Sequence, residues 1–227
     1  MEHRVLFVGN SGTYVNDMPG IFEHIAKKAG FDCVAATEAP DSMRFVDHAD
    51  PEQACGKDLL EKLEGFKPTI VFFQENGNVI LGTERGKDNE NVRFRCAASA
   101  KKLVQMTRDA GAQPYFYIRT AYEYVNKGAD RKLQTKLFSD FFGILGAALD
   151  VPCANAAKAF DICVTEHPHI DPYGPDRAHH SKVGSYLVAA TCFAKVFGTD
   201  FDTISPWELD ADTAKILWDI ARKVTQE

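Results

Sequence analysis

The sequence predicts an α/β fold: a three-layer α/β/α sandwich with a central parallel sheet of about five strands. Two features of the 227-residue chain predict it. Short, continuous apolar runs recur along the chain, as expected of strands that are buried on both faces. Segments with helical periodicity separate these runs. Strands that alternate with helices pair in parallel, and the helices then cover both faces of the sheet.

The expected strands are the apolar runs themselves. The three strongest runs are residues 5–8, 69–73 and 115–118, and two weaker ones are residues 33–36 and 151–153. Apolar residues follow one another in each run and do not alternate with polar residues, so neither face of the strand is expected to meet water. These runs account for the sheet of about five strands.

The expected helices carry apolar residues three or four positions apart on one face. The first begins near Pro19 and ends at Gly30, because proline suits the first turn of a helix and glycine suits the position after its last turn. The apolar faces of the other five lie within residues 59–63, 94–104 (beginning with Phe94), 133–145, 186–194 and 216–224, with Asp210 or Asp212 as the cap of the last.

The chain is expected to form a single domain, residues 1–227, because it is 45% hydrophobic and contains no repeat or low-complexity linker. Its 32 acidic and 26 basic side chains give a formal net charge of −6, and the basic residues form no stripe. Nucleic acid and anionic membranes are therefore not expected as partners. Six scattered cysteines, no visible signal peptide and no membrane-spanning stretch predict a cytoplasmic location.

The loop "GNSGTY", residues 9–14, follows the first expected strand and precedes the first expected helix. Ligands of parallel α/β sheets bind at the carboxyl ends of the strands, so Ser11 is expected at that edge. Three interpretations are open. The loop is a tight turn, since glycine, asparagine and serine are turn formers; or it cradles a phosphate, although no complete phosphate-binding motif is present; or Ser11 is a nucleophile activated by a nearby base.

Four of the seven histidines lie in residues 166–187, ahead of the fifth expected helix. Asp176 and His179 stand three positions apart there, so the carboxylate is able to bond one ring nitrogen while the other faces a serine. The other three histidines, including His48, are expected on the surface or on a helix face. Prolines and a glycine interrupt residues 166–187, so no metal site is expected there.

These motifs resemble those of the SGNH (GDSL-type) hydrolases, and the resemblance covers nearly the whole chain. Members carry a G-D-S or G-N-S motif after the first strand and a D-x-x-H motif near the end. Here these are Gly9-Asn10-Ser11 and Asp176-Arg177-Ala178-His179, followed by a helix sequence typical of one bacterial branch. The resemblance implies that Ser11 attacks an acyl carbon, that His179 is the general base and acid, and that Asp176 orients His179.

The middle motif departs from the family pattern. The chain reads Gln74-Glu75-Asn76-Gly77 where the family has glycine, any residue, asparagine and aspartate, although the same branch often carries the Gln-Glu pair. The resemblance implies that Asn76 is the oxyanion-hole asparagine and that the Ser11 N–H is the other donor. Asn10 and Gln74 are expected at the same site. The alternative is that Asn76 belongs to a plain turn. The Glu75 side chain is expected to turn away and bond backbone or an arginine.

Five further residues invite a role at the site. The family's second motif, a glycine, is not clear in this sequence, and Ser42 lies near its expected place. Arg119 follows the strand at 115–118 and is expected to bind a polar substrate group or to pair with a carboxylate such as Glu75. Three tyrosines are expected either to stack on a sugar or to pack: Tyr14, Tyr122 and Tyr124.

The sequence therefore predicts a serine esterase that cleaves a small acyl ester through an acyl-enzyme on Ser11, without a cofactor. A carbohydrate O-acetyl ester is the substrate that the resemblance favours. Two alternatives stay open. One is a catalytically degenerate binding protein on the same fold, because of the altered middle motif and the unclear second one. The other is a flavodoxin-like module that binds phosphate or flavin at residues 9–13.

Overall fold

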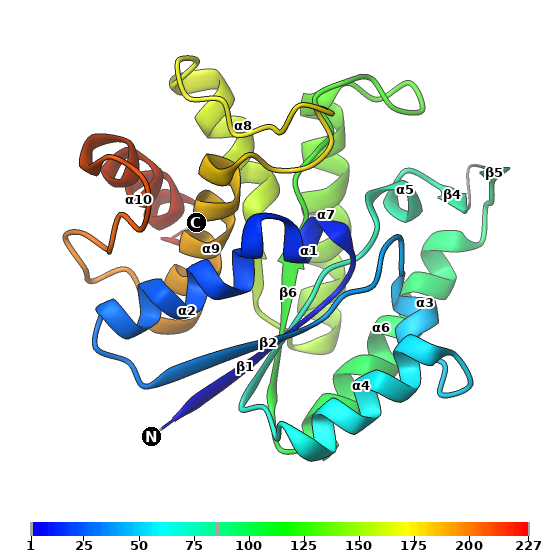
Figure 1. Ribbon diagram of the computed structural model, residues 1–227. Coiled ribbons are helices and arrows are strands. Elements are labelled where there is room, and N and C mark those ends of the chain that lie inside the picture. The colour runs from blue at the N-terminus through cyan, green and yellow to red at the C-terminus, as the bar shows by residue number, and fades with distance from the viewer. Residues whose placement is uncertain (1, 85–86, 227) are drawn as a thin grey trace.

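The computed structural model in Figure 1 describes residues 2–84 and 87–226. Its central sheet has five strands in the order β2-β1-β3-β6-β7, and every pairing is parallel. The strands are β1 (His3–Val8), β2 (Cys33–Glu38), β3 (Ile70–Phe73), β6 (Gln113–Ile118) and β7 (Cys153–Asn155). This sheet, flanked by helices, confirms the predicted α/β fold.

Four strands form at the predicted apolar runs, and the fifth is displaced by two residues. Residues 151–153 were expected, but β7 is Cys153–Asn155, which pairs with β6 from Phe116 to Ile118. Pro152 has no N–H to donate to a neighbouring strand, and its carbonyl accepts the Phe116 N–H. Regular pairing therefore begins only after the proline.

Helices cover both faces of the sheet (Figure 1). On one face lie α2 (Met18–Lys28), α8 (Ala156–Glu166), α9 (Lys182–Phe197) and α10 (Ala211–Gln226). On the other lie α4 (Ala54–Gly65), α6 (Val92–Asp109) and α7 (Arg131–Leu149). All six predicted helices are present among them.

Phe94 was expected on the apolar face of its helix, and this is wrong, because its side chain is 80% exposed. The face of α6 that packs on the sheet carries Val92, Cys96, Ala100 and Leu103 instead. These residues recur at intervals of three or four, so the helix is turned to bury them and Phe94 points to solvent.

The structure also contains elements that the sequence pattern did not predict. The longest is α8, which packs against α7, α9 and α10 and buries residues on more than one side. Its buried residues Ala156, Ala159, Phe160 and Cys163 do recur at helical intervals, but most of them are small, so the pattern is weakly apolar. The short elements are α1 (Ser11–Tyr14), η1 (Val15–Asp17), α3 (Phe45–His48), α5 (Gly77–Ile80) and the two-stranded β4 (Thr83–Glu84) and β5 (Lys87–Asp88).

Successive residues of the strands face two separate cores, which explains why the runs are continuous. Val5 and Phe7 of β1 point to the α2 and α9 side, whereas Leu6 and Val8 point to the α4 and α6 side. Phe7 stacks on Phe72 of β3, with ring centroids 5.0 Å apart. No helix formed by residues 2–84 and 87–226 combines the length and apolar character needed to cross a bilayer.

Candidate active site

Ser11 is the first residue of α1, directly after β1, so the fold holds it at the carboxyl edge of the sheet. Asn10 caps this short helix, its Oδ1 accepting the Gly12 N–H at 3.2 Å. A Cβ on Gly9 would lie 2.3 Å from Oγ1 of Thr13, so the turn requires a glycine there. The chain thus reverses sharply at the end of β1 and presents the Ser11 side chain beside the neighbouring loops.

The loop before α9 brings an imidazole to this serine. His179 Nε2 lies 2.8 Å from Ser11 Oγ, and His179 Nδ1 lies 2.5 Å from Asp176 Oδ2. The other carboxylate oxygen, Oδ1, accepts the backbone N–H groups of Ala178 and His179. The structure therefore brings Ser11, His179 and Asp176 together in one hydrogen-bonded row, although 168 residues separate the serine from the histidine.

The electrostatics of the row fix the direction of the hydrogen bonds. The hydrogen bond from the His179 side chain, followed by that from its backbone N–H, holds the pKa of Asp176 well below its usual range. An ionised carboxylate only accepts, so Nδ1 of His179 must carry the proton it donates to Asp176. In the neutral ring Nε2 is then the acceptor, and it faces the Ser11 hydroxyl.

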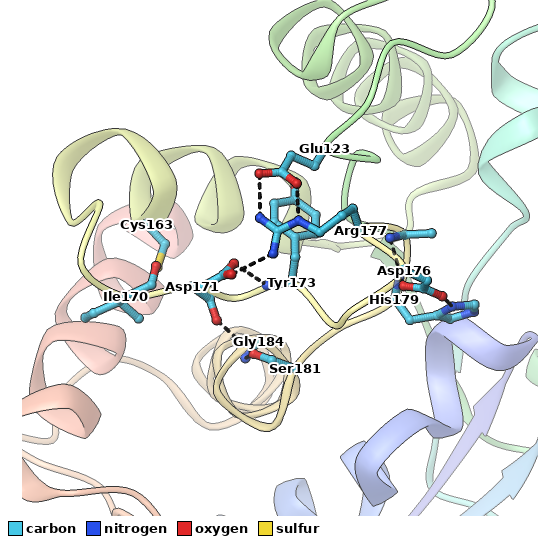
Figure 2. A network of polar contacts seen from close by, with 11 residues as sticks. Glu123, Cys163, Ile170, Asp171, Tyr173, Asp176, Arg177, His179, Ser181 and Gly184 are labelled. Atoms are coloured by element: carbon cyan, nitrogen blue, oxygen red, sulfur yellow. Dashed lines mark hydrogen bonds and ion pairs between the residues drawn. The ribbon is translucent and has the colours of Figure 1, made fainter.

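Arg177 fastens the loop that carries Asp176 and His179. Figure 2 shows its guanidinium between Glu123, which it contacts through two nitrogens, and Asp171, whose Oδ2 lies 2.6 Å from Nη1. The Glu123 N–H also donates to the Arg177 carbonyl at 3.1 Å. The backbone of Arg177 has a φ of 57°, in the left-handed region, so the chain turns sharply between Asp176 and His179. The D-x-x-H loop is thus tied to the segment that follows β6.

Gln74 and Asn10, both expected at the site, hold the loop of Ser11 from behind. The buried Gln74 accepts from the Thr13 hydroxyl at 2.9 Å and from the Asn10 N–H at 3.4 Å, and its amide nitrogen donates to the Glu75 carbonyl. The Asn10 Nδ2 donates to the Met43 carbonyl at 2.9 Å. Both side chains are thus engaged within the protein, between the loops after β1, β2 and β3.

Asn76 stands at the carboxyl end of β3 as the cap of α5. Its Oδ1 accepts the Asn78 N–H at 3.0 Å, and its Nδ2 makes no hydrogen bond within the described part of the chain. Asn76 lines a cavity of about 290 Å³ whose other walls include Ser42, Met43 and Arg44. The φ of Ser42 is 62°, in the left-handed region that favours glycine.

Arg119 is buried beneath the D-x-x-H loop. Its guanidinium donates to the Tyr122 hydroxyl at 2.6 Å and to the Ala178 carbonyl at 3.3 Å, and it lies 4.3 Å from the centroid of the Tyr122 ring. A Cβ at position 77 would come within 3.0 Å of this side chain, so Gly77 makes room for it. Arg119 was expected either to bind a polar substrate group or to pair with a carboxylate such as Glu75. It does not pair with Glu75, because its guanidinium contacts Tyr122 and Ala178 instead.

Two buried histidines support the site from within. His48 was expected on the surface or on a helix face. It is the last residue of α3 but is not at the surface, because it is 1% exposed, and its Nε2 donates to the Gly9 carbonyl at 2.8 Å. His180, next to His179, is buried against Thr120, and desolvation, followed by the charge of Arg119, lowers its pKa to about 3. A neutral His180 adds no positive charge beside His179. The sequence held no signal for His48, because its partner is 39 residues away.

The tyrosines lie around the site in different settings. Tyr124 is half exposed and stacks on Tyr122, with ring centroids 5.3 Å apart. Tyr14 is half exposed, and its hydroxyl donates to Asp41. Within residues 2–84 and 87–226, no three side chains of His, Cys, Asp or Glu are grouped so as to hold a metal ion.

Comparison with known proteins finds similarity in structure. No family model matches the chain, and no curated protein sequence matches it. A candidate SGNH hydrolase from Slackia heliotrinireducens is similar over 83% of this chain and 96% of its own, with 21% identity and a TM-score of 0.65. A DUF4886 family protein from Bacteroides uniformis is similar over 100% and 95%, with 13% identity and a TM-score of 0.80.

An acetyl xylan esterase, AlAXEase, is similar over 85% of this chain and 99% of its own, with 14% identity and a TM-score of 0.63. At these identities the likeness concerns the fold. The chain therefore shares the α/β fold of SGNH-type hydrolases and esterases, and its row of Ser11, His179 and Asp176 lies at the edge of the sheet where such folds bind ligands.

Proposed function

We propose that the protein is a serine ester hydrolase of the SGNH type, with Ser11 as nucleophile, His179 as general base and acid, and Asp176 as the group that orients His179. The 2.8 Å contact between Ser11 Oγ and His179 Nε2 is the observation that carries this proposal. A serine hydroxyl is a weak nucleophile until a base removes its proton, and this contact supplies the base.

The reaction proceeds in two halves. In the first, Ser11 Oγ attacks the carbonyl carbon while its proton passes to His179 Nε2, and the carbonyl oxygen becomes an oxyanion. The C–O bond to the alcohol then breaks, the alcohol leaves with the proton from His179, and an acyl-Ser11 ester remains. In the second half a water molecule gives a proton to His179 and attacks the acyl carbon. The bond to Ser11 Oγ then breaks, His179 returns the proton to that oxygen, and the acid leaves.

Two donors are proposed for the oxyanion: the backbone N–H of Ser11 and the Nδ2 of Asn76. Support comes from the Asn76 amide, whose Oδ1 is held by Asn78 and whose Nδ2 makes no bond to a described residue. Loss of one such donor typically lowers turnover by roughly a hundredfold to a thousandfold. Asn10, Gln74 and Arg119 act in this proposal by holding the loops of Ser11 and His179.

The proposed substrate is a small acyl ester, with a carbohydrate O-acetyl group as the leading candidate. Support comes from the acetyl xylan esterase of similar fold and from the cavity beside Asn76, whose walls include Ser42, Asn78 and Thr83. Polar side chains of this kind suit hydroxyl groups better than a long hydrocarbon chain.

Acetate release from p-nitrophenyl acetate and from acetylated xylo-oligosaccharides tests the proposal. We expect turnover of the acetyl esters, weaker turnover as the acyl chain of the nitrophenyl ester is lengthened to octanoyl, and none above background for Ser11→Ala. A folded protein that hydrolyses no ester would contradict the proposal and favour the degenerate binding protein. Release of a nucleotide or flavin on heating would favour the flavodoxin-like alternative.

A further inference from the structure

Glu75 is a buried carboxylate that joins two loops of the candidate site. Its Oε1 accepts the backbone N–H of Asn76 at 2.6 Å, and its Oε2 accepts the backbone N–H of Phe45 at 3.1 Å. Asn76 is the cap of α5, after β3, and Phe45 is the first residue of α3, in the connection after β2. The side chain bonds backbone, as the sequence analysis expected, and it does so on two separate segments.

Each of these two segments contributes a wall to the 290 Å³ cavity. Asn76 belongs to one, and Ser42, Met43 and Arg44, which lead directly into Phe45, belong to the other. We propose that Glu75 is a positioning residue: its ionised carboxylate fixes the two walls relative to each other and thereby places the Asn76 amide for catalysis. This inference rests on the esterase function proposed above, because the placement matters only if Asn76 stabilises an oxyanion.

Only the ionised carboxyl satisfies both loops. A carboxylate accepts at both oxygens, whereas a protonated carboxyl directs an O–H at one of its two partners, and both partners here are N–H donors. Protonation of Glu75 would therefore release the N–H of Asn76 or that of Phe45. The wall that is released is free to move, and a misplacement of about 1 Å at a catalytic group costs roughly a hundredfold in rate.

The surroundings of Glu75 bring its ionisation into the working range. Burial raises the pKa of Glu75 to about 7. The two backbone N–H donors, the Cys96 thiol and the charge of Arg44 favour the ionised form and lower the pKa, but burial has the larger effect. Arg44 comes from the start of α3 and is paired with Asp47, and Cys96 and Arg95 come from α6 and line the same hollow as Glu75. Glu75 is therefore mostly ionised above about pH 7 and mostly protonated below it.

The sign of this shift argues against a purely structural role. Because the pKa of Glu75 in the folded protein lies above its ordinary value of 4.5, its contribution to stability is fully present below pH 4.5 and is lost as the pH rises through about 7. The ionised form therefore lowers the free energy of unfolding. The ionised state joins the two loops and yet lowers stability. A role in positioning Asn76 explains why this carboxyl group is buried there.

The pH profile of kcat/KM distinguishes a positioning role from a structural one. Under this proposal, protonation of Glu75 lowers the rate without abolishing it. Ionisation of Glu75 then adds a separate acid-side step to the wild-type profile of log(kcat/KM) against pH, between about pH 5 and 7. The Glu75→Gln variant lacks this step, so its profile is expected to be less steep over that interval.

Steady-state hydrolysis of p-nitrophenyl acetate from pH 4.5 to 9 provides the test. Glu75→Gln is expected to lower kcat at pH 8 by roughly tenfold to a hundredfold, with little change in KM, and to remove the additional step between about pH 5 and 7. The matched control is Glu23→Gln on α2, which also removes a carboxylate that accepts a backbone N–H, that of Ala35 at 2.7 Å. This control is expected to leave kcat and the pH profile unchanged. Wild-type kcat in Glu75→Gln, or the same additional step in its profile, would overturn the inference.

A second measurement uses the wild-type protein alone and so does not depend on the folding of a variant. In wild-type protein, NMR of the Glu75 carboxyl carbon and of the Asn76 and Phe45 amides is expected to show one shared titration midpoint near pH 7. Amide signals that ignore the titration of Glu75 would overturn the inference even if the esterase function holds. Absence of Ser11-dependent turnover in the wild-type protein would overturn the proposed function and this role together, so the two failures are told apart.

Discussion

Replacing His179 with alanine is expected to lower kcat for p-nitrophenyl acetate by at least roughly ten-thousandfold. The imidazole is the only base that the structure brings within hydrogen-bonding distance of the Ser11 hydroxyl among the described residues, at 2.8 Å. Without it the serine stays protonated, and the leaving alcohol receives no proton. Removal of the base in serine hydrolases costs nearly as much as removal of the whole catalytic unit.

A neighbouring histidine provides the control for this variant. His169 is exposed in the same connection between α8 and α9, so His169→Ala removes an imidazole without touching Ser11. It is expected to retain wild-type kcat. If His179→Ala kept more than about a tenth of the wild-type kcat while folded, the assignment of His179 as the base would be wrong.

Asp176→Asn is expected to lower kcat by roughly a thousandfold to ten-thousandfold while the loop keeps its shape. The Oδ1 atom that accepts the backbone N–H groups of Ala178 and His179 is retained in asparagine. At the Oδ2 position, however, the amide presents N–H groups to Nδ1 of His179. That ring nitrogen then becomes the acceptor, Nε2 carries the proton, and Ser11 no longer faces a base.

The double variant His179→Ala/Asp176→Asn makes this prediction specific. If Asp176 acts only through His179, the double variant is expected to be as slow as His179→Ala alone, because the two groups work as one unit. Steady-state kinetics of the two single variants and the double variant give the comparison. Losses that multiply would show that Asp176 contributes by another route, and the orienting role would be rejected.

The sheet and the long helices were predictable because the spacing of apolar residues within each segment indicates which of its faces are buried. The run at 69–73 has apolar residues on both faces of β3, and Ile21, Phe22 and Ile25 mark the buried side of α2. Two predictions failed. The helical pattern of α8 is carried mostly by small residues and was missed, and Phe94 sits in an apolar pattern that the fold turns to solvent. The start of β7 was displaced because Pro152 has no N–H for a neighbouring strand, which apolar character alone does not indicate.

The candidate site divides in the same way. Ser11 and the pair Asp176 and His179 were predictable because residue type, spacing and position relative to strands carry the chemistry. The sequence predicted that Glu75 bonds backbone but not which segment, and it predicted no partner for His48, since Phe45 and Gly9 lie 30 and 39 residues away from them. The left-handed conformation of Ser42 is equally invisible to residue type, because serine at that position reads as an ordinary turn former.

The central claim is that the base from the D-x-x-H loop activates the hydroxyl of Ser11. Mass spectrometry after treatment with a fluorophosphonate measures this most directly, because the reagent reacts with a serine only when its hydroxyl is activated. The account predicts one adduct, on Ser11, that forms in the wild-type protein and not in His179→Ala. No adduct in the folded wild-type protein, or an adduct on another residue, would contradict it.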